Sequence, residues 1–413
     1  MNAPAFPDPS THVYPLVLLG GGHSHALWLK YWQQLENSHP AKQIRPLLIS
    51  DNTTSPYSGM LPGLLSGDYS HDDCHINLVR LSEKSNCDFL QRRCINIQRV
   101  DDLDRESIYR LDFAPLDSEQ LISETPEDHN PAPIFCKILS INIGSQPFVS
   151  TEESNKLPNS KSWKVKPINK FFQNWQSLQK SIADPSSEPS QKSIINIIGA
   201  GPAGVEIACA IKQSQPNSQV QLHSRSALPL PNFNTKTQKL CLQYLNKLDI
   251  EFIRSYIHPS TSTSSTSHLH NGFDTSKRDF TIWCTQSAAA KWLIDTDLTL
   301  SPKGFICVDE YLQTSFPGVF AAGDCLHFSP QPLPKAGVYA VRQAKTLFEN
   351  ICLCLAKNSK PTLVAFKPQK SILSIINMGN HYALAQKGRW STHGYLPWVY
   401  KHYIDRKFME LFK

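Results

Sequence analysis

The chain has 413 residues, of which 40% are hydrophobic and 18% are charged, an ordinary composition for a globular protein of two or three domains. Its formal net charge of +6 is too small to indicate nucleic-acid binding, and no stretch approaches the roughly 20 apolar residues of a membrane span. The eleven cysteines lack framework spacing, so we expect reduced thiols in a cytoplasmic protein.

The first strong signal is an apolar run, residues 16–19, that breaks into glycines and then opens a helix. Such a turn lets backbone N–H groups approach a pyrophosphate at a helix N-terminus. The pattern G-x-G-x-x-G is met except at its last position, where His25 replaces a glycine that normally permits close helix–strand packing. The expected cofactor contacts here are Gly20, Gly21, Gly22, His23, Ser24 and His25.

A second strand is predicted at residues 44–50, ending at Asp51. Asp51 is a candidate to accept hydrogen bonds from the adenosine ribose; the alternative is that it opens a turn with Asn52. Residues 56–63 contain many turn formers and predict a loop.

The next stretch, residues 101–133, is acidic without a clear period, so we expect a surface excursion. A strand is predicted at residues 136–143, followed by a polar linker at 150–162. Residues 258–278 are of low complexity and predict a mobile loop.

A second glycine-rich turn follows the apolar run 194–198 and matches G-x-G-x-x-G completely, with Gly199, Gly201 and Gly204. The next strand, residues 220–223, should end at the residue that contacts the ribose 2′ position, where an acid favours NADH and an arginine tolerates a 2′-phosphate. No acid follows this strand, and Arg225 is present. This favours NADPH or poor discrimination, unless Arg225 is merely a surface residue.

A third signature is the strand and turn at residues 318–324, followed by a predicted helix over 336–356. A strand ending in Gly323-Asp324 can present a carboxylate to the ribityl hydroxyls of a flavin. The helix N-terminus near Ala336 favours negative charge on a reduced ring. Lys335 would add a cation there, although it also suits an exposed loop; the candidate catalytic residues are Lys335 and His25.

Other possible chemistries have weaker support. The four histidines at positions 23, 25, 71 and 75 lack metal-site spacing, so no metal is expected. There is no C-x-x-C pair, and Cys352 and Cys354 would face different sides of a helix, which counts against a redox-active dithiol.

The last fifty residues predict a hairpin followed by an aromatic, basic tail over about 387–412. This composition suits a membrane surface. Packing on the body of the protein and a homodimer contact are the open alternatives.

With these motifs, the chain resembles the pyridine nucleotide-disulfide oxidoreductase superfamily of two-domain flavoproteins, on the dithiol-free side typified by type II NADH dehydrogenases. It is also similar to the flavoprotein module often fused ahead of selenide, water dikinase, although no kinase follows here. The residues that carry the second resemblance are 20–25, 56–63, 75–78, 333–343 and 404–409.

The resemblance implies FAD on the first loop and Asp324, and NAD(P)H on the second loop. Two departures affect it. The Ala-Thr-Gly usual after the first domain is Asn142-Ile143-Gly144 here, and its counterpart in the second domain is Cys284-Thr285-Gln286, without glycine. The latter change could disturb the crossover near the nicotinamide.

We therefore predict an α/β protein with two Rossmann-like domains, similar to glutathione reductase in fold, and a small C-terminal interface region. The expected parts are an FAD domain at 13–150 and 295–355, an NAD(P)H domain at 160–290 and a C-terminal region at 356–413.

The expected activity is FAD-dependent NAD(P)H oxidation with a small acceptor such as a quinone, at a cytoplasmic site or peripherally on a membrane. Two alternatives remain: a sulfide- or selenium-compound oxidoreductase using Cys136 or Cys325, and a low-turnover flavin-bound redox sensor or partner-binding protein.

Overall fold

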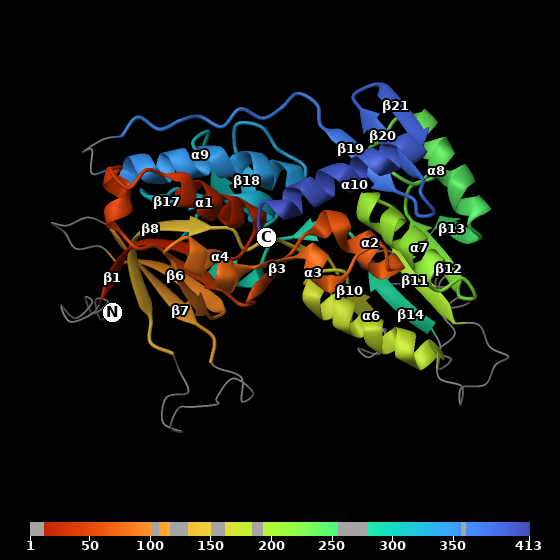
Figure 1. The fold of residues 1–413 in the computed structure, drawn as a ribbon, viewed down its shortest axis with the longest axis horizontal. Helices are drawn as coiled ribbons and strands as arrows, with labels where there is room; N and C mark the ends of the chain where they lie inside the picture. The colour runs from red at the N-terminus through yellow and green to blue at the C-terminus, as the bar shows by residue number, and fades with distance from the viewer. Residues whose placement is uncertain are drawn as a thin grey trace, which may run out of the picture.

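Two separate sheets, one mixed and one entirely parallel, organise the molecule in the computed structural model (Figure 1). The structure describes residues 12–100, 107–115, 131–149, 162–183, 193–254, 279–356 and 361–413. The predicted mobile loop at 258–278, nearly all of the linker at 150–162, and most of 101–133 lie outside these ranges.

The first sheet has the strand order β5-β2-β1-β8-β7-β6, and β17 pairs with the carboxyl-terminal half of β8. Residues 16–18 of β1 are fully buried, as expected of a central parallel strand covered on both faces. Its strands are β1 (Val13–Leu19), β2 (Leu47–Ser50), β5 (Asp88–Gln91), β6 (Cys94–Val100), β7 (Ile108–Phe113), β8 (Ile134–Ile141) and β17 (Val319–Ala321). The helices α1 (His23–Gln34) and α9 (Gly337–Leu355) pack against each other, and α4 (Leu78–Lys84) packs beside α1.

The second sheet is entirely parallel, with the order β10-β14-β11-β12-β13. Its strands are β10 (Ser162–Lys164), β11 (Ile194–Ile198), β12 (Gln219–Ser224), β13 (Ile250–Arg254) and β14 (Asp279–Trp283). Its helices are α6 (Ile168–Ala183), α7 (Pro202–Ser214) and α8 (Thr235–Lys247). Both sheets therefore have the strand–turn–helix construction that the glycine motifs predict, and the α/β fold class is confirmed.

Short two-stranded pairings lie outside the two main sheets. The crossover near Gln286 forms: β9 (Gln146–Pro147) pairs antiparallel with β15 (Ser287–Ala288), so loss of the glycine does not prevent it. The antiparallel pair β3 (Thr54–Pro56) and β4 (His75–Asn77) lies beside α2 (Leu61–Ser66) and α3 (His71–Cys74). The parallel pair β16 (Ile306–Val308) and β18 (Leu326–Phe328) flanks β17, and short 3₁₀ turns lie at Pro40–Gln43, Ser58–Met60, Lys291–Asp295 and Gly323–Cys325.

The C-terminal region is a three-stranded antiparallel sheet followed by one helix. It consists of β19 (Leu373–Asn377), β20 (Ala383–Lys387), β21 (Trp390–Gly394) and α10 (Tyr395–Glu410). In Figure 1, α10 runs from the second half of the molecule toward the first, and the C-terminus lies near the centre.

Two expectations about local structure are wrong. Residues 56–63 are not a loop, because Pro62 occupies the first turn of α2, where a missing N–H costs nothing. Residues 108–113 are not an irregular excursion: they form β7, whose alternating burial fits a strand with one covered face. The hairpin predicted in the last fifty residues forms from β19 and β20, and the tail after it, for which no secondary structure was predicted, is helical from Tyr395 to Glu410.

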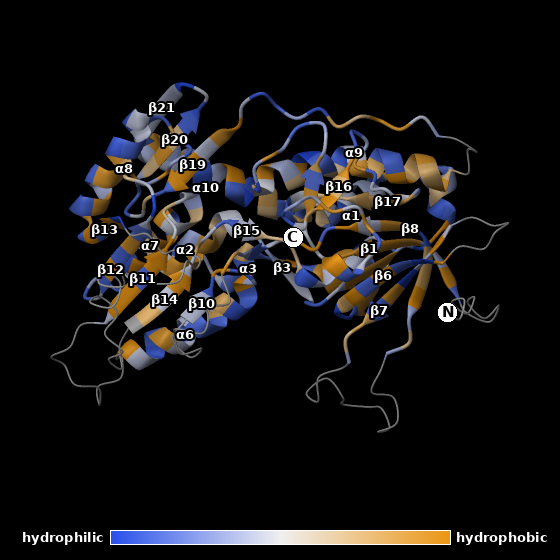
Figure 2. Ribbon diagram, turned by 180° about the vertical axis from the view of Figure 1, so that it is seen from behind, coloured by the Kyte–Doolittle hydropathy of each residue, from blue (hydrophilic) through white to orange (hydrophobic). Residues whose placement is uncertain are grey.

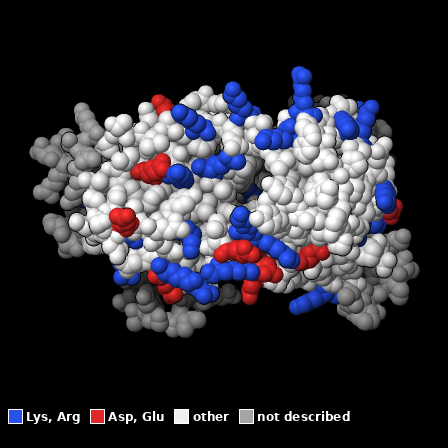
Figure 3. Space-filling view, turned by 45° about the horizontal axis from the view of Figure 1, so that its top comes forward, with Lys and Arg blue, Asp and Glu red and all other residues white. Residues whose placement is uncertain are grey.

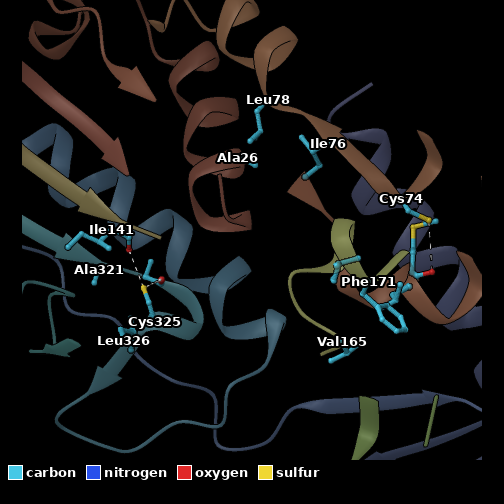
Figure 4. Packing of buried hydrophobic residues seen from close by; sticks show 14 of the residues in the cluster. Ala26, Cys74, Ile76, Leu78, Ile141, Val165, Phe171, Ala321, Cys325 and Leu326 are labelled. Atoms are coloured by element: carbon cyan, nitrogen blue, oxygen red, sulfur yellow. Dashed lines mark hydrogen bonds between the residues drawn. The ribbon is translucent and has the colours of Figure 1, made fainter. Parts of the chain in front are cut away.

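Apolar side chains fill the junctions between elements. Trp28 and Trp32 stack with ring centroids 5.0 Å apart and are almost completely buried between α1 and α9. Figure 2 shows the hydrophobic strands enclosed by helices with polar outer faces. Figure 4 shows Ile141, Ala321 and Cys325 meeting where β8 and β17 end.

Helix α10 buries charge where most helices bury apolar residues. Its buried stripe is Pro397, Lys401, Asp405 and Met409. The Lys401 Nζ donates to Asp405 Oδ2 at 3.0 Å and to the Gly59 carbonyl at 2.9 Å. Burial opposes the charge of Lys401, but Glu206 and Asp405 outweigh burial and raise its pKa. The pair therefore joins α10 to the segment after β3.

We expect Lys401→Met to destabilise the protein by about 3–5 kcal/mol, because it leaves a buried carboxylate without its cation. Chemical unfolding followed by circular dichroism measures this loss. The matched control is Lys345→Met, which breaks another i,i+4 pair, Lys345–Glu349, on an exposed face of α9. Exposed pairs contribute only about 0–1 kcal/mol, so equal losses in both variants would contradict the assignment.

Candidate functional site

The first glycine turn packs so closely against its neighbours that a Cβ at any of its three glycines would collide with them. Gly20 has a φ of +96°, and a Cβ there would lie 2.5 Å from the Asn142 carbonyl oxygen. A Cβ on Gly21 would meet Leu78 at 2.3 Å, and one on Gly22 would meet Asn142 Oδ1 at 2.1 Å. Helix α1 begins directly after Gly22 without a side-chain cap. Its first N–H groups are therefore available to an anion such as a pyrophosphate.

His25, which replaces the third glycine, points into the fold rather than toward these N–H groups. Its Nδ1 lies 2.7 Å from the Gly20 carbonyl oxygen and its Nε2 lies 2.7 Å from Ser140 Oγ on β8. The side chain is completely buried, and burial lowers its pKa to about 4. Both nitrogens are engaged by the protein, so this geometry favours positioning of the loop over the catalytic role considered above.

Ser24 and Ala336 also connect elements. The Ser24 hydroxyl donates to the Ala340 carbonyl at 2.7 Å, which fixes α1 against α9. Ala336 is the N-cap residue of α9 and supplies no side-chain cap. The first N–H groups of α9 thus face the same region as those of α1. We call this region, at the carboxyl ends of β1, β8 and β17, the junction.

Asp51 stands where β2 ends, as predicted. Its Oδ1 accepts a hydrogen bond from Asn52 Nδ2 at 2.8 Å, and its carbonyl accepts one from Gln91. The side chain remains exposed. Both interpretations of Asp51, ribose contact and turn residue, are compatible with this placement.

Asp324 is the charged centre of the junction. It follows Gly323, whose N–H donates to the buried Gln343 Oε1 at 2.7 Å. Lys166 Nζ donates to Asp324 Oδ2 at 2.9 Å and Ser145 Oγ donates to the same oxygen at 3.3 Å. Within the described residues no hydrogen bond reaches Oδ1, so this oxygen can accept one from a bound hydroxyl.

His23 completes this group. Its Nε2 is buried without a hydrogen-bond partner, while the Pro56 carbonyl accepts from the ring. Burial lowers the pKa of His23 to about 4, and Asp324 and Lys166 act on it in opposite directions. The imidazole is thus neutral, and it contacts the rings of Tyr57 and Phe408 at centroid distances of 5.4 and 5.8 Å.

Lys335 lies in the turn that leads into α9. Its ammonium donates to the Leu326 carbonyl and lies 3.8 Å from the ring centroid of Phe305. Burial lowers its pKa. The cation that bonds to Asp324 is instead Lys166, which the sequence analysis missed because it shows only as a lysine before a proline.

The second glycine turn packs closely at two of its three glycines. Gly199 has a φ of +111°, and a Cβ there would lie 2.6 Å from the Cys284 carbonyl oxygen. A Cβ on Gly204 would lie 1.7 Å from the Gly199 carbonyl oxygen, so only glycine allows this approach of α7. Gly201 has open space around it. Beyond Ser224 at the end of β12, Arg225 is exposed.

Glu206, one turn into α7, lies in a second buried charged group. It accepts a hydrogen bond from the Asn377 N–H at 2.8 Å. Burial raises its pKa to about 7, although Lys401 and that N–H act in the opposite direction. Tyr57 donates to Asp405 Oδ1 at 3.1 Å. The group therefore connects α7 of the second half with α10 and the segment before α2.

The cysteines are all free, and most are buried. The Cys325 thiol donates to the Ala322 carbonyl at 3.2 Å, and burial raises its pKa to about 11. Cys136 pairs with Tyr14 at the amino-terminal ends of β8 and β1, opposite the end that carries the glycine turn. Neither position favours a reactive thiolate. Among the described residues no His, Cys, Asp or Glu cluster could hold a metal ion.

The residues at the junction fit a dinucleotide with a flavin. The glycine turn packs too closely against Asn142 and Leu78 to carry side chains, and two buried acceptors, His23 Nε2 and Asn142 Oδ1, have no partner among the described residues. Together with the unbonded Asp324 Oδ1, they offer hydrogen-bond acceptors to a polyhydroxylated chain.

The comparisons agree with this geometry. The model of the family described as pyridine nucleotide-disulphide oxidoreductase matches residues 15–344. The chain belongs to this family. The cofactors of the family are FAD and NAD(P)H, and the predicted superfamily is therefore confirmed.

Individual relatives are distant. The chain is similar to ferroptosis suppressor protein 1 of Xenopus tropicalis, with 24% identity over 202 residues, 46% of this chain and 52% of that protein. The chain thus matches about half the length of this curated relative.

Two solved structures share the fold over nearly the full chain. The NDH2 of Plasmodium falciparum with NADH has a TM-score of 0.67 at 14% identity, covering 97% of both chains. The sulfide:quinone oxidoreductase of Aquifex aeolicus has a TM-score of 0.66 at 16% identity, covering 97% of this chain and 91% of that one.

We expect Asp324→Ala to weaken FAD binding by about 1.5–3 kcal/mol, the contribution of a hydrogen bond to a charged group. Titration of the deflavinated protein with FAD, followed by fluorescence quenching, measures the affinity. Asp72→Ala is the control, because that carboxylate is fully exposed on α3. An unchanged affinity in the Asp324 variant would remove this residue from the site.

Proposed function

We propose that the protein is an FAD-dependent NAD(P)H oxidoreductase whose acceptor is a small molecule of the quinone class. The observation that carries the proposal is the pair of glycine-lined turns, one on each sheet, with Asp324, Lys166 and His23 gathered between the sheets. When bound, the flavin supplies the redox chemistry by taking a hydride from the nicotinamide and passing two electrons on.

The protein's own contribution is binding, orientation and exclusion of water. The N-termini of α1 and α7 receive the two pyrophosphates, and the glycines allow their close approach. Tyr57 and Phe408, whose centroids are 4.7 Å apart, cover the junction with apolar surface. The acceptor needs a proton with the electrons, and Glu206, whose pKa is raised to about 7 by burial, is a side chain able to exchange one near neutral pH.

The alternative of a sulfur- or selenium-compound oxidoreductase needs a reactive thiol. Cys136 is completely buried at the far end of its strand, and the Cys325 thiol is held by backbone carbonyls. The dithiol-free route therefore has more support. A low-turnover sensor would bind the same cofactors, so only measured turnover distinguishes it.

We expect NADPH to reduce the bound flavin at least as fast as NADH, because β12 is followed by Arg225 and no acid. Anaerobic stopped-flow mixing with each nucleotide measures the rates, and steady-state oxidation over a panel of quinones then measures turnover. Arg225→Ala should slow reduction by NADPH selectively. A strong NADH preference that this variant leaves unchanged would contradict the role of Arg225, and absent turnover with every acceptor would favour a sensor.

We also propose peripheral contact with a membrane through the outer face of α10. This face is apolar although it is exposed: Leu396 is 78% and Tyr403 57% exposed, and Val399, Tyr400, Ile404 and Leu411 lie on the same side. Arg406 and Lys407 flank it, and Figure 3 shows that Lys and Arg predominate on the face turned forward there. Basic and aromatic side chains around an apolar stripe suit an anionic lipid surface. No helix among the described residues could span a bilayer.

We expect the triple variant Leu396→Ser, Tyr400→Ser, Tyr403→Ser to reduce binding to vesicles of phosphatidylcholine and phosphatidylserine by at least about tenfold, since roughly 1.4 kcal/mol of burial is lost. Co-sedimentation measures the binding. Ile294→Ser, at an equally exposed apolar residue outside the helix, is the control. If the wild-type protein does not bind vesicles and is a dimer, and the triple variant is a monomer, the face is assigned to a second copy instead.

A further inference from the structure

The ion pair between Lys166 and Asp324 crosses from one half of the molecule to the other. Lys166 follows β10 at the edge of the second sheet, where the Val165 N–H donates to the Trp283 carbonyl. Asp324 follows β17 of the first sheet. Their 2.9 Å contact joins side chains that are 32% and 16% exposed, so the pair is much less screened than a surface ion pair.

The position of Asp324 determines which parts of the candidate site lie near Lys166. Asp324 lies between the N-termini of α1 and α9, and its Oδ2 is occupied by Lys166 and Ser145, whereas its Oδ1 is open. His23 feels the charge of both Lys166 and Asp324. A flavin whose ribityl chain reaches Oδ1 therefore has the Lys166 ammonium as a near neighbour.

The other candidate cation, Lys335, interacts with Asp324 through its charge but makes its hydrogen bond elsewhere. Lys335 donates to the Leu326 carbonyl and lies over the Phe305 ring. His23 is neutral, because burial lowers its pKa to about 4. Of the three basic side chains that the described structure brings to Asp324, Lys166 is the one whose charge is bonded directly to it.

We propose that Lys166 is the positioning residue that sets the electrostatic potential at the flavin, and that it does so from the nicotinamide-binding half. A positive charge there stabilises the added negative charge of a reduced flavin and so raises its midpoint potential. Removing the charge acts twice, because it also leaves the Asp324 carboxylate uncompensated. The inference rests on the proposed function, since it requires bound FAD.

The same pair links flavin electrostatics to the arrangement of the two halves. Lys166 leads directly into α6, and Asn169 in the first turn of α6 contacts His75 Nε2 at 2.9 Å and Thr54 Oγ1 at 3.4 Å on the other half. Any movement of β10 and α6 relative to the first sheet would change the distance from Lys166 to Asp324. The potential of the flavin would then depend on how the nicotinamide-binding half is seated.

The test compares Lys166→Met and Lys166→Arg with Lys335→Met and Lys164→Met in the full-length flavoprotein. Lys164 is exposed on the same strand edge and serves as the matched control. Two readouts are independent of turnover: the midpoint potential by dye equilibration, and the dissociation constant of sulfite, which adds reversibly to oxidised flavin to give an anionic adduct. FAD content and thermal unfolding are recorded for every variant.

We expect Lys166→Met to lower the midpoint potential and to weaken sulfite binding by at least about tenfold, with Lys166→Arg close to wild type, Lys164→Met unchanged and a clearly smaller shift in Lys335→Met. If Lys166→Met does not retain FAD, Lys166→Gln replaces it, and FAD loss from both neutral variants with retention in Lys166→Arg supports the proposal.

Three results would overturn it: a potential and sulfite affinity that stay at wild-type values while FAD is bound, the same shift in Lys335→Met, or FAD loss that Lys166→Arg does not restore. Wild-type protein that binds no FAD would overturn the proposed function as well, which separates the two failures.

Discussion

The close approach of three strand ends at Asn142 is the constraint on which both the fold and the candidate site depend. The Asn142 N–H donates to the Leu19 carbonyl at 2.8 Å, and its Nδ2 donates to the Ala322 carbonyl at 2.7 Å. These bonds join the carboxyl ends of β1, β8 and β17, where ligands of open parallel sheets bind. A Cβ on Gly20, Gly22 or Gly323 would collide with Asn142. The glycines are therefore required by this residue as much as by any phosphate.

The two glycine turns let the following helix pack against its strand in different ways. In the second turn Gly204 lets α7 approach so closely that its missing Cβ would overlap the Gly199 carbonyl oxygen. In the first turn His25 occupies the equivalent position, and its ring is accommodated by a hydrogen bond to Ser140 on the neighbouring strand. His25 thus replaces a close backbone contact with a buried polar link. Its two ring nitrogens give the Gly20 carbonyl and the Ser140 hydroxyl a hydrogen-bond partner each. The altered motif thus remains compatible with the same fold.

Much of this architecture could be predicted from the sequence, because it depends on local patterns. Apolar runs ending in glycine gave both central strands and the helices after them, and Gly323-Asp324 marked the end of β17. The structure assigns Lys166 to Asp324 in a way that no local pattern reveals, since the contact joins residues 158 positions apart. Helix α10 was missed for a related reason. Its buried stripe contains Lys401 and Asp405 while its exposed face is apolar, so the usual periodicity is inverted.

That inversion has a consequence for how the molecule holds its sites together. An apolar stripe would attach α10 to any hydrophobic surface, whereas Lys401 and Asp405 accept only the partners that satisfy them: Gly59, Tyr57 and the carboxylate of Glu206. These partners come from the first half, before α2, and from α7 of the second. Buried charges are costly unless each is paired, so α10 is bound in one register only. With Lys166–Asp324 on the other side, two ion-paired groups fix the halves against each other around the space between the glycine turns.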